Sequence, residues 1–174
     1  TSFYSLAHKD YCNTNNIELE IKLKVDLKEW NRVLDIIKSN SIDLGVQTHF
    51  ATYFYPIFRN FQNEYLRIRN ENGKYILNYK NNFMNNCWNE YETLIDNIKK
   101  KKKILSCLNF KKIGNINKVR KSYLYKEKYE VSFDNVDNIG TFIEIEVKNI
   151  TSDYENEYNN LINILKDLKI DLNL

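Results

Sequence analysis

Like-charged residues recur two positions apart along the chain, and this spacing is the first feature that could carry chemistry. The pairs are Glu18/Glu20, Arg67/Arg69, Glu90/Glu92, Lys118/Arg120 and Glu144/Glu146. In an extended strand the two members of a pair point the same way, about 6.6 Å apart at a rise of about 3.3 Å per residue. Like charges on one face repel each other, so each pair needs an opposite charge nearby.

Two interpretations of these pairs are open. The outer, solvated faces of amphipathic strands would explain each pair separately. Alternatively, the strands close into a barrel with the charged faces inward, which would line one cavity with acidic and basic pairs. Carboxylates at this spacing are oxygen ligands that suit Mg²⁺ or Mn²⁺, and arginine and lysine bind phosphates directly. A polyanion bound together with a divalent metal would neutralise both kinds of pair.

The first elements along the chain are a strand and a helix. The stretch "NNIELEIKLKV", residues 15–25, alternates strictly between apolar and charged positions and predicts a strand. The following "DLKEWNRVLDIIKS" predicts a helix that begins with a capping box of Asp26 and Glu29. Its expected apolar stripe consists of Leu27, Trp30, Leu34 and Ile37. Residues 46–58 are β-prone up to Pro56, which would end a strand.

The stretch "EYLRIRNENGKYILNYK" contains the clearest hairpin. Asn72-Gly73 suits a two-residue type I′ turn between two alternating runs. This turn pairs residue 71 with residue 74, and it sets Arg69 opposite Ile76, Arg67 opposite Asn78 and Tyr65 opposite Lys80. We therefore expect Arg67, Arg69 and Lys80 to share one face of the sheet.

The second half of the chain alternates strand and helix patterns. Strands are predicted over 87–95, 116–125, 128–134 and 141–147, with a loop over 135–140 and a helix between Ile98 and Leu108. A C-terminal amphipathic helix over 151–168 would begin with a capping box of Ser152 and Glu155 and face Tyr154, Leu161, Leu165 and Leu168 inward. Without internal repeats or linkers, this order predicts an antiparallel α+β arrangement in one domain, residues 1–174.

Composition limits the possible classes of protein. With 43% hydrophobic and 28% charged residues, the chain of 174 residues is globular, and a net charge of +3 does not by itself indicate a nucleic-acid or membrane partner. The lysine run 99–103 would point all round a helix, which favours a solvated helix end over a binding face. The three scattered cysteines, and the lack of an apolar span or signal peptide, favour a cytoplasmic location.

Two further observations narrow the possible sites. His8 and His49 are far apart in the sequence and have no paired cysteine or carboxylate motif, so neither is predicted to bind metal. No glycine-rich phosphate-binding loop is present, and the chain has only four glycines. Phosphate would therefore be held by side chains and not by a loop of backbone N–H groups.

Four motifs, in order, resemble a known family. They are E-x-E-x-K at 18–22, "LRIR" with "GKYILNYK", K-x-R-x-x-Y at 118–123, and "FDNVDNIGTFIEIE". Together they resemble the CYTH group of triphosphate tunnel metalloenzymes, most closely its CyaB-like, class IV adenylyl cyclase branch. The resemblance covers the chain from about residue 17 to about residue 148.

The resemblance implies an eight-stranded antiparallel closed β-barrel, or tunnel, with helices packed on its outside. It also implies a triphosphate substrate and one or two Mg²⁺ or Mn²⁺ ions. The implied metal carboxylates are Glu18, Glu20, Asp134, Glu144 and Glu146, with Glu90 and Glu92 serving a second metal or orienting the basic side chains. The implied triphosphate-binding residues are Lys22, Arg67, Arg69, Lys80, Lys118 and Arg120. Of these residues, the implied catalytic set is Glu18, Glu20, Lys22, Lys118 and Arg120.

The implied reaction is conversion of ATP to cyclic AMP and pyrophosphate. Two alternatives remain open: hydrolysis of tripolyphosphate, thiamine triphosphate or a nucleoside triphosphate, and non-catalytic binding of polyphosphate or an RNA 5′-triphosphate. The expected partner is the small-molecule triphosphate, without DNA or membrane, and the protein would be a monomer or homodimer. The chain departs from the family pattern at "ATYFYP", where Ala51 and Tyr55 stand at acidic positions, and at 81–89, which lacks a basic residue.

Overall fold

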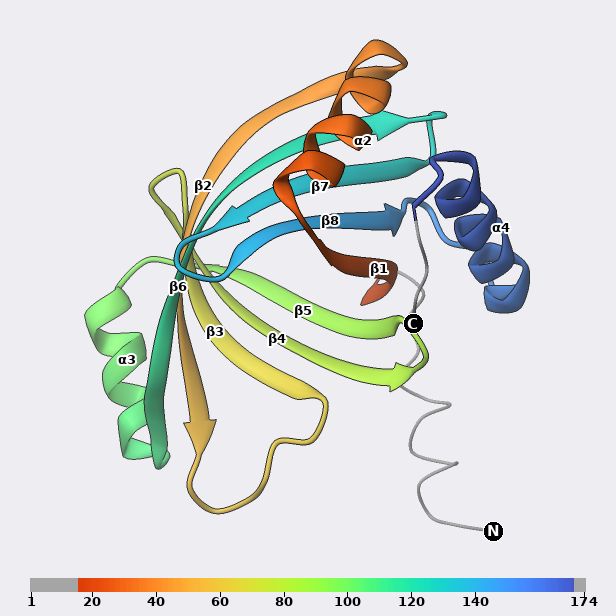
Figure 1. The fold of residues 1–174 in the computed structure, drawn as a ribbon. Coiled ribbons are helices and arrows are strands. Elements are labelled where there is room, and N and C mark those ends of the chain that lie inside the picture. Colours follow the sequence, from red (N-terminus) through yellow and green to blue (C-terminus); the bar gives the residue numbers. More distant parts are fainter. Residues whose placement is uncertain (1–15, 171–174) are drawn as a thin grey trace, which may run out of the picture.

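A closed barrel forms the centre of the computed structural model, which describes residues 16–170. Its eight antiparallel strands follow one another round the barrel in the order β1-β5-β4-β3-β2-β6-β7-β8 (Figure 1). The strands are β1 (Ile17–Val25), β2 (Ser41–Pro56), β3 (Glu64–Glu71), β4 (Lys74–Met84), β5 (Cys87–Ile95), β6 (Phe110–Tyr125), β7 (Tyr129–Val136) and β8 (Gly140–Val147). The predicted fold class is confirmed.

Within residues 16–170, three helices lie on the outside of the barrel: α2 (Leu27–Ser39), α3 (Ile98–Cys107) and α4 (Tyr154–Asp167). Helices α2 and α4 cover the part of the wall that contains β1, β7 and β8, and α3 lies beside β6 at the opposite side of the molecule (Figure 1). The helices cover the wall and leave the interior of the barrel free for polar side chains.

The main hydrophobic core lies between the wall and the helices, because each strand turns its apolar side outward. Leu19, Val131, Phe133, Ile143 and Ile145 are fully buried on this outer face. They pack against the helices, whose buried apolar side chains include Trp30, Val33 and Ile37 of α2 and Leu161, Ile164 and Leu165 of α4. A smaller cluster under α3 contains Phe54, Ile68, Ile95 and Leu105. Alternation along each strand therefore leaves its charged side facing into the barrel.

The predicted hairpin has the expected register. Glu71 pairs with Lys74, Arg69 with Ile76, Arg67 with Asn78 and Tyr65 with Lys80. Both turn residues adopt positive φ, 49° at Asn72 and 89° at Gly73, as a type I′ turn requires. The side chains of Arg67, Arg69 and Lys80 consequently reach the same interior face.

Strands β2 and β6 are longer than the sequence predicts. Residues 41–45 extend β2 through a bulge between Asp43 and Gly45, where the glycine has a φ of 95°. A second register shift, between Tyr53 and Phe54, lets β6 begin at Phe110. Each irregularity interrupts the two-residue alternation that identifies a strand in sequence.

Two details of the predicted helices are wrong. Leu27 is 62% exposed, and the buried stripe of α2 consists of Trp30, Val33 and Ile37, because position 33 lies between the other two on the helix face. Helix α4 begins after Asp153, whose carboxylate accepts from the backbone N–H of Asn156, so Ser152 is not the cap. The predicted start of α2 is confirmed, since Asp26 accepts from the N–H of Glu29 at 2.7 Å.

Some sequence features lie outside the described residues, namely the segment 1–14 with His8 and Cys12. Within residues 16–170 the other two cysteines are free, Cys87 buried and Cys107 exposed. No helix in this range has the length and apolar character needed to cross a bilayer.

Candidate functional site

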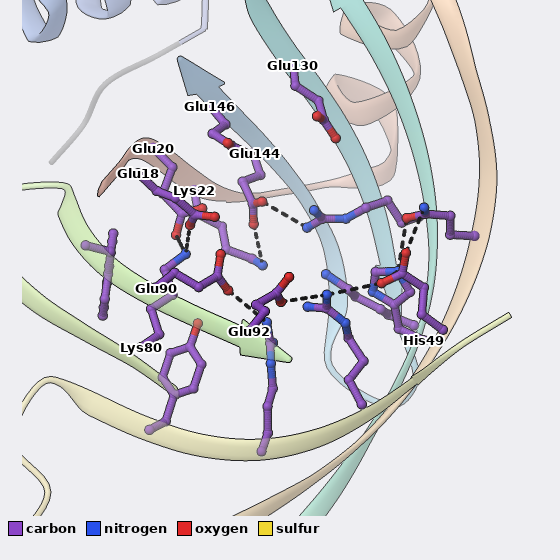
Figure 2. Close-up of a pocket in the computed structure, with 18 of the residues that line it drawn as sticks. Glu18, Glu20, Lys22, His49, Lys80, Glu90, Glu92, Glu130, Glu144 and Glu146 are labelled. Carbon is purple, nitrogen blue, oxygen red and sulfur yellow. Dashed lines mark hydrogen bonds and ion pairs between the residues drawn. The ribbon is translucent and has the colours of Figure 1, made fainter. Parts of the chain in front are cut away.

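The interior of the barrel contains a cavity of about 580 Å³ whose lining is dominated by charged side chains (Figure 2). Every predicted site residue except Asp134 lines it. These residues are Glu18, Glu20, Lys22, Arg67, Arg69, Lys80, Glu90, Glu92, Lys118, Arg120, Glu144 and Glu146. The structure thus brings together pairs that are up to 128 positions apart in the sequence, from Glu18 to Glu146. The solvated outer-face interpretation is wrong for these residues.

A group of cations surrounds Asp134, which has no exposed surface. Its carboxylate accepts from Arg120 Nε at 2.7 Å and from Lys118 Nζ at 2.9 Å, and Lys22 Nζ approaches it at 3.4 Å. Glu144 accepts from Arg120 at 3.0 Å and from Lys22 at 2.9 Å. Strands β1, β6, β7 and β8 therefore hold three cations on two shared carboxylates.

The two arginines of β3 are fixed from the neighbouring strands. Arg67 donates to Asn78 Oδ1 at 2.7 Å, and Arg69 donates to Glu92 at 2.9 Å. Asn78 in turn donates to Glu90 and Glu92 at 2.6 and 3.1 Å. Glu90 and Glu92 therefore contact the side chains that position the arginines.

A second cluster is rich in carboxylates and contains two cations, Lys80 and Lys148, the latter donating to Glu146 at 2.9 Å. Glu18 and Glu20 both accept from the buried Lys80, the latter at 2.9 Å (Figure 2). Glu146 lies directly opposite Glu20 across the pairing of β1 with β8. Like charges in this arrangement repel each other.

The two carboxylate groups differ in pKa. Burial raises the pKa of Glu18, of Glu20 and of Glu146, and neighbouring carboxylates raise each of them further. For Asp134 burial acts in the same direction, but the hydrogen bond and charge of Arg120 outweigh it and lower the pKa to about 2. The cations around Glu144 likewise lower its pKa. The cluster of Glu18, Glu20 and Glu146 is therefore short of positive charge, whereas Asp134 and Glu144 are already neutralised.

The deficit of positive charge raises the question of whether these carboxylates suit a divalent metal ion. In the part of the chain that the structure describes, no three Asp, Glu, His or Cys side chains are arranged as a metal-binding set. The donors nevertheless fit a hard cation, because Glu18, Glu20 and Glu146 supply carboxylate oxygens whose mutual repulsion Lys80 and Lys148 only partly offset.

Lys118 provides a prediction for the pH dependence of ligand binding. Burial, and next the charge of Arg120, lower the pKa of Lys118 to about 8. Since a lysine loses its charge above its pKa, we expect the affinity for a non-cleavable triphosphate to fall by about fivefold between pH 8 and pH 9. The variant Lys118→Arg should remove this step. Calorimetric titrations of both proteins across this range test the prediction, and superimposable pH profiles would contradict it.

His49 lines the same cavity although the sequence analysis sets it aside. It is 6% exposed, and its Nε2 lies 3.1 Å from Gln47 Oε1. Because the amide nitrogen of Gln47 donates to Glu71, its oxygen is left to accept from His49. Burial, followed by the charges of Lys118 and Arg69, lowers the pKa of His49 to about 3. The ring is therefore neutral at physiological pH.

Several other residues that line the cavity were not predicted from the sequence: Gln47, Tyr53, Tyr65, Glu71, Asn86, Trp88 and Glu130. The two-residue alternation of side chains along each strand could have identified most of these residues. Tyr65 and Glu71 share the parity of Arg67 and Arg69 on β3, and Trp88 shares that of Glu90 on β5. Likewise, Glu130 shares the parity of Asp134 on β7.

The fold and the site together define a closed β-tunnel whose interior is lined by both basic and acidic side chains. The sequence profile of the CYTH domain matches residues 16–171, and the chain belongs to this family. Members of the family are adenylyl cyclase-like or triphosphatase enzymes that act on triphosphates.

Relatives and solved structures agree with this assignment. The Methanocaldococcus jannaschii protein named "Putative adenylate cyclase MJ0240" is 34% identical over 163 residues, which cover 88% of this chain and 90% of that protein. The PH1819 protein from Pyrococcus horikoshii has a similar structure, with a TM-score of 0.76, 25% identity, and coverage of 88% of this chain and 91% of that one. HpAC1 from Hippeastrum, named "Putative adenylyl cyclase" with a dominant triphosphatase activity, has a TM-score of 0.63 at 17% identity, with 88% of both chains covered.

Proposed function

We propose that the protein is a metal-dependent adenylyl cyclase that converts ATP to cyclic AMP and pyrophosphate in the tunnel. The observation that carries the proposal is the division of one cavity into a cation group and a carboxylate cluster short of positive charge. A bare anion would be repelled by the carboxylates, and a metal alone would leave the cations without a ligand. A triphosphate bound with Mg²⁺ or Mn²⁺ satisfies both.

The cation group would bind the phosphates. We assign this role to Lys22, Arg67, Arg69, Lys118 and Arg120, and we assign to Lys80 a share in neutralising the carboxylates. Asp134 accepts hydrogen bonds from Arg120 and Lys118 and so fixes both side chains before substrate binds. The two cations would then face the phosphoryl group on which negative charge develops. Asp134 is therefore proposed to position these two cations, because its own oxygens are occupied by them.

The carboxylate cluster would hold the metal. We assign Glu18, Glu20 and Glu146 to it, with Glu144 at the border with the cations. A divalent ion bound here would stabilise negative charge on the phosphates. Glu90 would share a proton with Glu18, since a hydrogen bond to Glu90 is among the causes that raise the pKa of Glu18. Glu92 would orient Arg69.

In the proposed reaction the ribose 3′-hydroxyl attacks the α-phosphorus. A phosphorus–oxygen bond forms to the ribose, and the bond from the α-phosphorus to the bridging oxygen breaks. The hydroxyl proton passes to a carboxylate or to water, and pyrophosphate leaves with the electron pair. Arg120 and Lys118 would stabilise the charge on the leaving group.

Triphosphate hydrolysis is the second candidate, because the same residues would serve it. A water molecule would then attack the terminal phosphorus, releasing one phosphate. All of the assigned cations and carboxylates would act on the phosphates. None of their assigned roles requires a ribose, so they serve hydrolysis as well as cyclisation. Binding of an RNA 5′-triphosphate or polyphosphate without turnover is disfavoured by the carboxylate cluster, which would repel such a ligand in the absence of metal.

Product identification tests the proposal. Purified protein is incubated with ATP and Mg²⁺ or Mn²⁺, and the products are followed by phosphorus NMR and chromatography. We expect cyclic AMP and pyrophosphate in equal amounts, and no turnover after addition of a chelator. Release of inorganic phosphate without cyclic AMP would establish the hydrolase. Tight, metal-independent binding without any product would favour the binding module.

A further inference from the structure

One end of the tunnel changes abruptly from charged to apolar side chains. On β8 the inward series runs from Glu146 and Glu144 to Phe142, and on β6 it runs from Arg120 and Lys118 to Ile116. Strands β2 and β7 change in the same way. We call the four side chains at this level the apolar ring: Ala51, Ile116, Val136 and Phe142.

The apolar ring surrounds a separate cavity of about 150 Å³, to which Ile139 of the β7–β8 turn also contributes. Four cations of the proposed phosphate site line both this cavity and the large one: Lys22, Arg67, Arg69 and Lys118. A ligand whose phosphates contact these cations can therefore extend into apolar surroundings without leaving the tunnel. An apolar cavity of about 150 Å³ accommodates a ring the size of benzene.

We infer that the cavity inside the apolar ring receives the organic group of the substrate, so that the protein selects a triphosphate with an aromatic substituent over inorganic tripolyphosphate. The inference rests on the proposed function and goes beyond it by fixing the direction in which the substrate lies. The organic group lies toward Phe142, and the terminal phosphate lies toward Arg120 and the carboxylate cluster.

The opposite end of the tunnel suits an aromatic group less well. Its aromatic side chains are already in contact with cations and with each other. Lys80 lies 5.3 Å from the ring of Trp88, Arg67 lies 5.2 Å from that of Tyr65, and the two rings are 6.2 Å apart.

The apolar ring also has one contact between a cation and an aromatic ring, and there the cation is one that we assign to phosphate binding. Lys22 lies 5.7 Å from the ring of Phe142 and is itself a proposed phosphate contact. Ile139 is 46% exposed at the rim, so its side chain is available to cover a bound aromatic group. Burial of such a group against Phe142 and Ile139 would add affinity that tripolyphosphate cannot obtain.

The test compares the binding of two non-cleavable ligands, α,β-methylene ATP and methylene-bridged tripolyphosphate, in the presence of Mg²⁺. Dissociation constants are measured by calorimetry for the wild type, Phe142→Ala and Ile139→Ser. We expect each variant to bind the nucleotide about tenfold more weakly and tripolyphosphate within about twofold of the wild type. Ile139 lies in an exposed turn, so its replacement reports on the subsite even if Phe142→Ala disturbs the barrel.

Two further variants separate the possible outcomes. Phe58→Ala removes an exposed phenyl ring away from the tunnel and should leave both constants unchanged. Equal weakening of both ligands, no weakening in either variant, or a selective loss of nucleotide affinity in Trp88→Ala would overturn the inference. Binding of tripolyphosphate but not of the nucleotide by the wild type would overturn it while the triphosphate site stands. Failure of the wild type to bind either ligand would overturn the proposed function as well.

Discussion

Exchange of Glu18 for glutamine is expected to lower metal-dependent turnover by about 100-fold or more, while the protein remains at least as stable as the wild type. The loss of activity follows from removal of a charged oxygen ligand from the proposed metal cluster, a change comparable to the loss of one charge-stabilising group in an active site. Lys80 keeps Glu20 as its partner, so no buried cation is left alone.

The stability effect has the opposite sign because the pKa of Glu18 is raised in the folded protein. A carboxyl group with a raised pKa binds its proton more tightly in the folded state than in the unfolded state. Its contribution is therefore favourable below the unfolded-state pKa of 4.5 and is lost as the pH rises toward the folded-state value. A neutral amide at position 18 does not have this titration, so unfolding free energies of Glu18→Gln should fall less between pH 5 and pH 8.

Turnover, urea unfolding and metal titration together check this prediction. In the wild type, the Glu18–Glu90 pair should release a proton when Mg²⁺ or Mn²⁺ binds, seen as a binding enthalpy that depends on the ionisation enthalpy of the buffer. The variant Glu18→Gln should lose this dependence. Glu155→Gln, at an exposed position in the first turn of α4, is the matched control. Full metal-dependent activity in Glu18→Gln would contradict the assignment.

The parts of the fold that were predictable are those set by local chemistry. Asn72-Gly73 fixes the β3–β4 register because few other turns fit two residues at positive φ, and strict alternation in residues 17–25 fixes which side chains of β1 face inward. The ends of β2 and β6 were not predictable, because they depend on pairing between residues as distant as Ser41 and Tyr125. The residues near Ser41 in the sequence do not indicate which distant strand pairs with them.

The sequence predicts which residues line the site, but it does not predict how each of them is paired or how its pKa is shifted. The charged pairs indicate that carboxylates and cations meet, and the structure brings them into one cavity. Sequence motifs treat Asp134 and Glu18 alike, as carboxylates of one set. Only the three-dimensional neighbours separate them, since Arg120 and Lys118 occupy the oxygens of Asp134 while Glu90 and Glu146 crowd Glu18. Burial and pairing across strands, rather than residue type, therefore determine the proposed roles.

Exchange of Asp134 for alanine is expected to lower the free energy of unfolding by about 3–5 kcal/mol, the usual cost of removing one partner from a buried ion pair. The fully buried carboxylate accepts from Arg120 Nε and Lys118 Nζ at 2.7 and 2.9 Å. Its loss would leave two cations close together in the wall of the tunnel. Because the pKa of Asp134 is lowered from 3.8 to about 2, its contribution is complete above pH 3.8 and is lost as the pH falls toward 2.

Urea unfolding of Asp134→Ala, Arg120→Met and the double variant distinguishes the positioning role from metal ligation. If Asp134 positions the cations, the double variant should be more stable than the sum of the single effects predicts, because Arg120→Met removes one of the unpaired charges. Metal affinity, measured by calorimetry, should change little in Asp134→Ala, since Glu18, Glu20 and Glu146 remain. A metal ligand would give the reverse pattern, with nearly unchanged stability and a loss of metal affinity. The arrangement around Asp134 therefore ties the stability of the barrel to the same two cations that are proposed to bind the triphosphate.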